Sequence, residues 1–490
     1  MLPRVFLIVA CFSVICSTSL AQEIEGKTVY KPAKAYRPID LISTLERRAY
    51  EAENKANTVR LRERYEIIHQ QLMNMAEKGL FLKDVEMEAL LNSVMQKIIA
   101  ANKLSRKPEQ FLIIRQADVN AFCFGEGTFG ITTGLLARIT NESTLAQVLG
   151  HEIAHYELNH TKKTATADKE NKTGKKIRRG VKEIQYDDKH VTQGDLDSLK
   201  KWVYTRFHFT RELESEADSL GLILATNAGY DQKAALTLIS ILDSARTSKF
   251  PLGSLIHDTF NSVKVPFQDD WLAKRLSLFD KAPGDTFFSN DSLETHPGLP
   301  LRRQALNQSI GTRDLMLPES STSFFPDADL ENIQSAIHQK KHDHALMLAI
   351  TMLPHQPEHS AYLKSVITSI LADVYQARGT PLFGSYVSAY TAGYGKELKQ
   401  VNAFLNNIHK PELGELAFDF MNRKGNFDPA VEVHYYQLWR ICNLTGRDEV
   451  KDKVKKVYRE KFGKGEYYGD MDNPIQIGLP KSPKTTRGYN

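Results

Sequence analysis

The chain has 490 residues, of which 41% are hydrophobic and 25% are charged, and this balance excludes a disordered or fibrous protein. Its net charge of +5 is small for the length and gives no reason to expect nucleic acid as a partner. A chain of this length has room for several domains, each with its own buried core.

The N-terminal residues have the pattern of a secretory signal peptide. Arg4 supplies the positive start, an apolar run covers residues 5–16, and Ser19-Leu20-Ala21 offers a small-x-small cleavage site. We therefore expect residues 1–21 to be a signal peptide and the mature chain to be exported. An uncleaved membrane anchor is the alternative. Beyond residue 21 no apolar run reaches the roughly 18 residues that a membrane span needs, so no transmembrane segment is expected there.

The chain has four cysteines, and two of them lie within the signal peptide. Cys11 follows a lipobox-like Ile8-Val9-Ala10, so a lipid-anchored form is a second alternative for the N-terminus. Cys123 and Cys442 remain in the mature chain, and two cysteines do not make a disulfide scaffold. Two separate buried thiols are the simpler interpretation, and a disulfide between them stays open.

Helical and strand patterns alternate in the first part of the mature chain. Residues 41–103 carry apolar side chains at helical spacing, whereas residues 110–114 have the pattern of a short strand. Residues 121–133, rich in Phe and Gly, predict a strand or hairpin. Asn141 is a candidate N-cap for the next helix, and Glu142 suits its first turn.

The segment that follows this helix is basic. Residues 161–182 are rich in Lys and Arg and poor in large apolar residues, which is typical of a solvated loop. A lid that gates a substrate site is the alternative. Helical character then covers residues 196–227, and Gly229 is a candidate C-terminal cap.

The C-terminal half predicts a second, all-helical domain. Residues 231–307 are helical in parts, with breaks at prolines, and residues 318–326 have the composition of a boundary loop. We expect an α+β domain over residues 22–317, an all-helical domain over residues 327–464, built from helical hairpins of the repeat type, and a disordered tail over residues 465–490.

The segment Gly150-His151-Glu152-Ile153-Ala154-His155 predicts a metal site. Residues four apart share one face of a helix, so the imidazoles of His151 and His155 converge on one point. Imidazole nitrogen suits zinc, and Glu152 lies beside the metal, where it can take a proton from a zinc-bound water as general base. The alternative is a helix with two surface histidines.

A catalytic zinc needs a third protein ligand. A third histidine in the spacing HExxHxxGxxH is excluded because Leu158 and Thr161 occupy the required positions. In a continuous helix His160 would point about 140° away from His155, as expected of a structural or surface histidine. The remaining candidate is Glu214 in Glu214-Ser215-Glu216-Ala217-Asp218, with Asp218 accepting the far ring N–H of a ligand histidine.

These motifs resemble the zinc peptidases that include the HtpX heat-shock protease and the CAAX prenyl protease. The family combines HExxH with ExxAD, matched here by residues 151–155 and 214–218. Asn120-Ala121-Phe122 is similar to a family segment on the substrate-facing strand, which implies substrate-binding roles for these three residues. Thr295-His296-Pro297, followed by Arg302, is similar to another.

The resemblance implies one zinc ion per subunit and roles for two further residues. His296 would lie near the metal and act in catalysis by steadying the oxyanion or gating the open position, where a donor is useful. Arg302 would orient that loop or bind substrate.

The signal peptide and the helical C-terminal region are similar to the soluble periplasmic branch of this family, which joins the peptidase to tetratricopeptide repeats. That likeness implies a periplasmic zinc endopeptidase in protein quality control, acting on unfolded or misassembled polypeptides, including outer-membrane proteins or their assembly machinery. Two other functions stay open, namely a chaperone-like client-binding protein with a gated or weak protease site, and a zinc hydrolase that acts on a non-peptide bond.

Overall fold

The computed structural model describes residues 29–39, 42–43, 59–125, 127–161, 163, 211–245, 249–273, 299–310, 324–389 and 395–472. The expected signal peptide, most of the basic stretch 161–182 and His296 lie outside these ranges.

A five-stranded mixed sheet forms the centre of the first domain. Its strands are β1 Lys34–Ala35, β2 Phe81–Lys83, β3 Gln110–Ile114, β4 Ala121–Gly125 and β5 Thr128–Thr132. The spatial order is β1-β2-β3-β5-β4, in which β3 and β5 are parallel and the other neighbours are antiparallel. The expected strand at residues 110–114 and the expected hairpin after residue 121 are both present.

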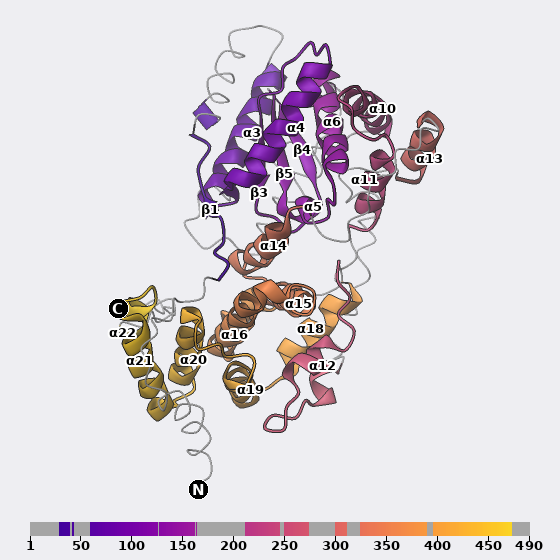
Figure 1. Cartoon of the computed structure of the whole chain (residues 1–490). Coiled ribbons are helices and arrows are strands. Elements are labelled where there is room, and N and C mark those ends of the chain that lie inside the picture. The colour runs from indigo at the N-terminus through magenta and orange to yellow at the C-terminus, as the bar shows by residue number, and fades with distance from the viewer. Residues whose placement is uncertain are drawn as a thin grey trace, which may run out of the picture.

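Alternating side chains on the strands build a core on each face of the sheet. Leu112 and Ile114 of β3 pack with Leu72 of α3 Val59–Glu77, whereas Phe111 and Ile113 face α4 Val85–Ala101 and α6 Glu142–Glu157. This two-sided burial follows from the period of two along a strand. Helices therefore cover both faces, as Figure 1 shows, and the α+β prediction is confirmed.

The helix that carries the HExxH motif begins at the expected cap. The Asn141 Oδ1 accepts a hydrogen bond from the Thr144 backbone N–H at 2.8 Å, and this satisfies one of the free N–H groups of the first turn of α6. The second motif lies on α10 Arg211–Asn227, which ends before Gly229 at φ +89°. Two further helices, α11 Ala234–Asp243 and α13 Leu299–Ser309, and the short α5 Thr133–Leu136 complete this domain.

The second domain is all-helical, as expected. Its helices are α12 Leu255–Phe260, η1 Asp269–Leu272, α14 Pro326–His338, α15 His342–Met352, η4 Pro357–His359, α16 Ser360–Ala377, α17 Phe383–Tyr386, α18 Lys396–Asn407, α19 Lys410–Asn422, α20 Glu432–Leu444, α21 Asp448–Phe462 and α22 Tyr468–Asp472. None of the helices in the described ranges is long and apolar enough to cross a bilayer.

One segment crosses from the first domain into the second, which the expected boundary at residue 317 did not anticipate. Residues 249–273 follow α11 in the sequence, but Phe260 packs against Phe404 and Phe420 in the helical core. Figure 1 shows α12 in the lower, helical body beside α18. The spacing of apolar residues predicts a buried face but not the core against which it packs. The sequence pattern therefore could not show that this segment packs in the second domain.

Two other expectations about local structure are corrected. Residues 41–103 were expected to be helical, but Gly79 at φ +62° ends α3 and the strand β2 precedes α4. The tail was expected to be disordered from residue 465, but α22 is helical and its Met471 is buried in the core of the second domain. Cys123 and Cys442 are both buried and do not form a disulfide, in agreement with two separate thiols.

Candidate metal centre

The two helices that carry the motifs, α6 and α10, are in direct contact at a pair of glycines. A Cβ atom on Gly150 of α6 would lie 2.8 Å from the Gly221 carbonyl oxygen of α10, and a Cβ on Gly221 would lie 2.8 Å from the His151 backbone nitrogen. Real Cβ atoms do not approach backbone atoms so closely, so only glycine permits this crossing. Ala217, which is fully buried, adds a second small residue on α10. The two helices therefore cross in close contact.

Because the helices are close, three donor groups converge. The Nε2 atoms of His151 and His155 are 3.0 Å apart, and the carboxylate oxygens of Glu214 lie 3.6 Å from the first and 3.5 Å from the second. Tetrahedral zinc with bonds near 2.0–2.1 Å would separate its donors by about 3.3 Å. All three side chains are buried, and His151, His155 and Glu214 form a group of the size that a metal ion requires. The residues present therefore fit a zinc ion.

A buried contact with Asp218 fixes the orientation of His151. Its Nδ1 lies 3.0 Å from Oδ1 of Asp218, and because a carboxylate only accepts hydrogen bonds, this ring nitrogen carries a proton. A neutral imidazole then has an unprotonated Nε2, which points at the Nε2 of His155. The Nε2 lone pair of His151 is thus available to a metal ion that lies between the two rings.

Arg302 joins this arrangement from α13. Its Nε and Nη2 each donate to Asp218 at 2.6 Å, and its Nη1 lies 2.8 Å from Oε2 of Glu214. Burial alone raises the pKa of Asp218, but hydrogen bonds from Arg302 and His151 outweigh it and hold that pKa well below the usual value. The guanidinium is therefore held by two carboxylates inside the protein. These contacts give Arg302 a role in positioning Asp218 and Glu214, and because Arg302 also lines the pocket, its expected contact with substrate stays a prediction.

His160 also lies in the site, contrary to the expectation from a continuous helix. Helix α6 ends at Glu157, and Asn159 takes the left-handed conformation with φ 55°, which turns the chain back. The Nδ1 of His160 then lies 2.7 Å from Nδ1 of His155. Burial lowers the pKa of His160, against the opposing effect of Glu216.

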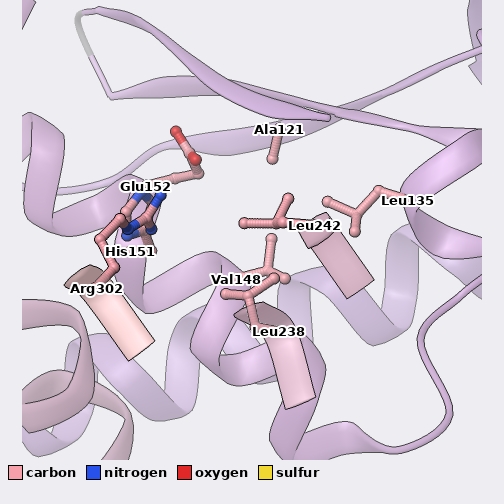
Figure 2. Close-up of a pocket in the computed structure, with 8 residues that line it drawn as sticks. All are labelled: Ala121, Leu135, Val148, His151, Glu152, Leu238, Leu242 and Arg302. Atoms are coloured by element: carbon pink, nitrogen blue, oxygen red, sulfur yellow. The ribbon is translucent and has the colours of Figure 1, made fainter. Parts of the chain in front are cut away.

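Glu152 lies beside the three donors, at the polar end of a pocket. Figure 2 shows Glu152, His151 and Arg302 at one end of this pocket and apolar side chains at the other. The apolar wall consists of Leu135, Val148, Leu238 and Leu242, with Ala121 of β4 above it. The pocket thus places a carboxylate and an apolar surface next to the metal position.

The residues of the segment Asn120-Ala121-Phe122 lie in different environments, some at the pocket and some in the core. Ala121 lines the pocket, and the Asn120 backbone carbonyl accepts from the Thr132 N–H at 3.0 Å. The Phe122 side chain packs with Phe124 and Phe81 in the core on the α3 side. Alternate residues of a strand point to opposite faces, so the side chains of Ala121 and Phe122 lie on different faces of the sheet, and the substrate-binding roles of the three residues stay predictions.

Comparison with known proteins agrees with this geometry. Residues 86–310 match the model of peptidase family M48. The chain is 30% identical over 129 residues to the mitochondrial metalloendopeptidase OMA1 of Arabidopsis thaliana, covering 26% of this chain and 24% of the relative. It is 26% identical over 174 residues to the beta-barrel assembly-enhancing protease of Escherichia coli K12, covering 35% of this chain and 36% of the relative.

The chain thus spans only about a quarter to a third of the length of these relatives. The family match nevertheless covers both helices that carry the donor groups, since α6 and α10 lie between residues 142 and 227. The segment from residue 86 to residue 310 is therefore similar to peptidase family M48 over the part of the chain that carries both motifs.

Proposed function

We propose that this protein is a zinc-dependent endopeptidase that hydrolyses peptide bonds in unfolded or misassembled proteins. The observation that carries the proposal is the convergence of His151, His155 and Glu214, with donor separations of 3.0, 3.5 and 3.6 Å. His151 and Glu152 also line the polar end of a pocket. Two histidines and one glutamate leave one position of a tetrahedral zinc open, which is typical of catalytic sites.

Each residue of the candidate metal centre has one chemical role in this proposal. His151 and His155 offer Nε2 lone pairs, and Glu214 offers a carboxylate, to hold the ion. Zinc, when bound, supplies a Lewis acid that polarises the scissile carbonyl and makes water more acidic. Glu152 accepts a proton from the attacking water and then delivers it to the nitrogen of the leaving amine. Asp218, held by Arg302, keeps the proton of His151 on Nδ1.

The pocket supports a polypeptide substrate with an apolar side chain next to the scissile bond. Leu135, Val148, Leu238 and Leu242 form an apolar wall beside Glu152, and such a wall favours burial of an aliphatic or aromatic side chain. An extended substrate that follows β4, where Ala121 faces the pocket, stays a prediction. His296 as an oxyanion donor also stays a prediction.

We place the protein in the bacterial periplasm, on two grounds. The N-terminal residues have the pattern of a signal peptide, and one relative is by its name a beta-barrel assembly-enhancing protease. Misassembled outer-membrane proteins or their assembly machinery are therefore the proposed clients.

The test compares the wild type with Glu152→Gln on an unfolded protein such as casein. This substitution removes the proton acceptor and keeps all three metal ligands, so cleavage should fall about 10²- to 10⁴-fold while bound zinc stays the same. Equal cleavage by both proteins contradicts the proposed role of Glu152. If neither cleaves and both bind unfolded clients, the protein is instead a client-binding protein.

A further inference from the structure

His160 makes a contact that zinc peptidase chemistry does not itself demand. Its side chain is fully buried, its Nδ1 lies 2.7 Å from Nδ1 of His155, and its Nε2 lies 2.9 Å from Oε2 of Glu216 on α10. Glu216 in turn accepts from Lys163 Nζ at 2.8 Å. His160, Glu216 and Lys163 thus form a hydrogen-bonded series of side chains next to the proposed metal ligand His155. The series reaches the protein surface, where the Glu216 side chain is 47% exposed.

The hydrogen-bond contacts determine which ring nitrogen of His155 and of His160 carries a proton. If Nε2 of His155 binds a metal, it carries no proton, so the neutral ring carries its proton on Nδ1. That N–H donates to Nδ1 of His160, which must then be unprotonated. The remaining proton of His160 is therefore on Nε2, where it donates to the Glu216 carboxylate. Each ring has one tautomer that satisfies both of its neighbours.

We propose that His160 is a positioning residue that raises zinc affinity by fixing the tautomer and ring orientation of His155. It acts toward His155 as Asp218 acts toward His151, so each ligand histidine has its own hydrogen-bond acceptor. Glu216 completes the arrangement by holding the proton of His160 on the ring nitrogen remote from His155. Such outer partners typically change metal affinity by about 10- to 100-fold.

Contacts with Arg106 stabilise the turn that brings His160 next to His155. The Nη1 of Arg106 donates to the Tyr156 carbonyl at 2.6 Å and to Oδ1 of Asn159 at 2.7 Å. The guanidinium also lies 3.8 Å from the centre of the Tyr156 ring. These contacts stabilise the end of α6 and the left-handed residue together, and so they hold His160 next to His155.

The test is the zinc dissociation constant, measured by competition with a chromogenic chelator on the full chain. His160→Phe keeps the ring shape and removes the acceptor, so the dissociation constant should rise about 10- to 100-fold. His160→Asn retains an acceptor close to the position of Nδ1, and its affinity should return toward that of the wild type. Glu216→Ala changes a partly exposed side chain, and it should raise the dissociation constant about 3-fold or more.

His434→Phe is the matched control. This histidine is buried in α20, where Nδ1 accepts from the Asp428 N–H at 2.9 Å and Nε2 lies 2.8 Å from the Ala361 carbonyl. Its loss should lower the unfolding temperature without changing zinc affinity. A folded His160→Phe that binds zinc as the wild type does overturns the inference. If His160→Phe does not fold, an unchanged dissociation constant for Glu216→Ala overturns it.

The inference depends on the proposed zinc function, and the two can fail separately. A wild-type protein that binds no zinc contradicts the proposed function. A wild-type protein that binds zinc, with affinity unchanged in His160→Phe, contradicts only the role of His160.

Discussion

Gly221→Ala tests whether the close crossing of α6 and α10 sets the geometry of the metal centre. The added Cβ would lie 2.8 Å from the His151 nitrogen, 2.9 Å from its Cα and 3.0 Å from the Gly150 carbonyl carbon. Ordinary contacts begin at 3.4 Å, so the closest pair must separate by 3.4 − 2.8, or 0.6 Å. All three contacted atoms are backbone, so a rotamer change cannot relieve the clash and the helices themselves must move.

A shift of this size is large for a metal site. Glu214 lies on the helix that would move and the two histidines on the other, whereas zinc–ligand distances tolerate only about 0.2 Å. We therefore expect Gly221→Ala to weaken zinc binding by about tenfold or more, and overpacking to lower stability by about 1–3 kcal/mol. Chelator competition measures the first, and urea unfolding of the metal-free protein measures the second.

The control for this substitution is Gly384→Ala in α17. A Cβ at Gly384 meets no atom within 4 Å, so the change should leave zinc affinity unaltered and leave stability equal or slightly higher. If Gly221→Ala folds and binds zinc with the wild-type dissociation constant, the helix crossing does not determine the position of Glu214, and the reasoning is refuted.

Three further predictions follow from particular contacts. Arg302→Leu leaves Asp218 buried without its guanidinium partner, so urea unfolding of the metal-free protein should show a loss of about 3–5 kcal/mol; a loss below 1 kcal/mol would contradict this account. Burial raises the pKa of Asp373, but hydrogen bonding to His342 and the charge of Arg440 outweigh it and leave the pKa below its usual value. Asp373 therefore stabilises the fold above pH about 4 and loses this effect as pH falls, so the stability difference between wild type and Asp373→Asn should shrink in acid; a constant difference would exclude the ion pair as its cause. Leu242→Ala enlarges the pocket, so a peptide library should show a shift toward bulkier side chains beside the scissile bond, and an unchanged preference would show that this wall does not contact substrate.

Features that depend on neighbouring residues could be predicted from the sequence. The strand at residues 110–114, the cap at Asn141 and the pairing of the two motif histidines all follow from local pattern and helical spacing. The approach of the ExxAD helix could be expected because Ala217 and Gly221 are small.

Features that depend on distant contacts could not be predicted in this way. Helical spacing predicted that His160 points away from the site because it assumed a continuous helix, whereas the helix ends at Glu157 and Asn159 has a positive φ. Arg302 was recognised only through a motif, and its buried carboxylate partners lie 84 and 88 positions away along the chain. Residues 249–273 join the helical core through packing that spacing alone does not reveal.

The most direct test is the zinc content of purified protein, wild type against Glu214→Gln, after dialysis at a fixed low concentration of free zinc. The glutamine has the same shape but loses the charged donor that comes from the second helix. We predict one zinc per chain in the wild type and a loss of at least about 100-fold in affinity for the variant. A variant that retains one zinc at the wild-type affinity would contradict coordination of the metal by both helices.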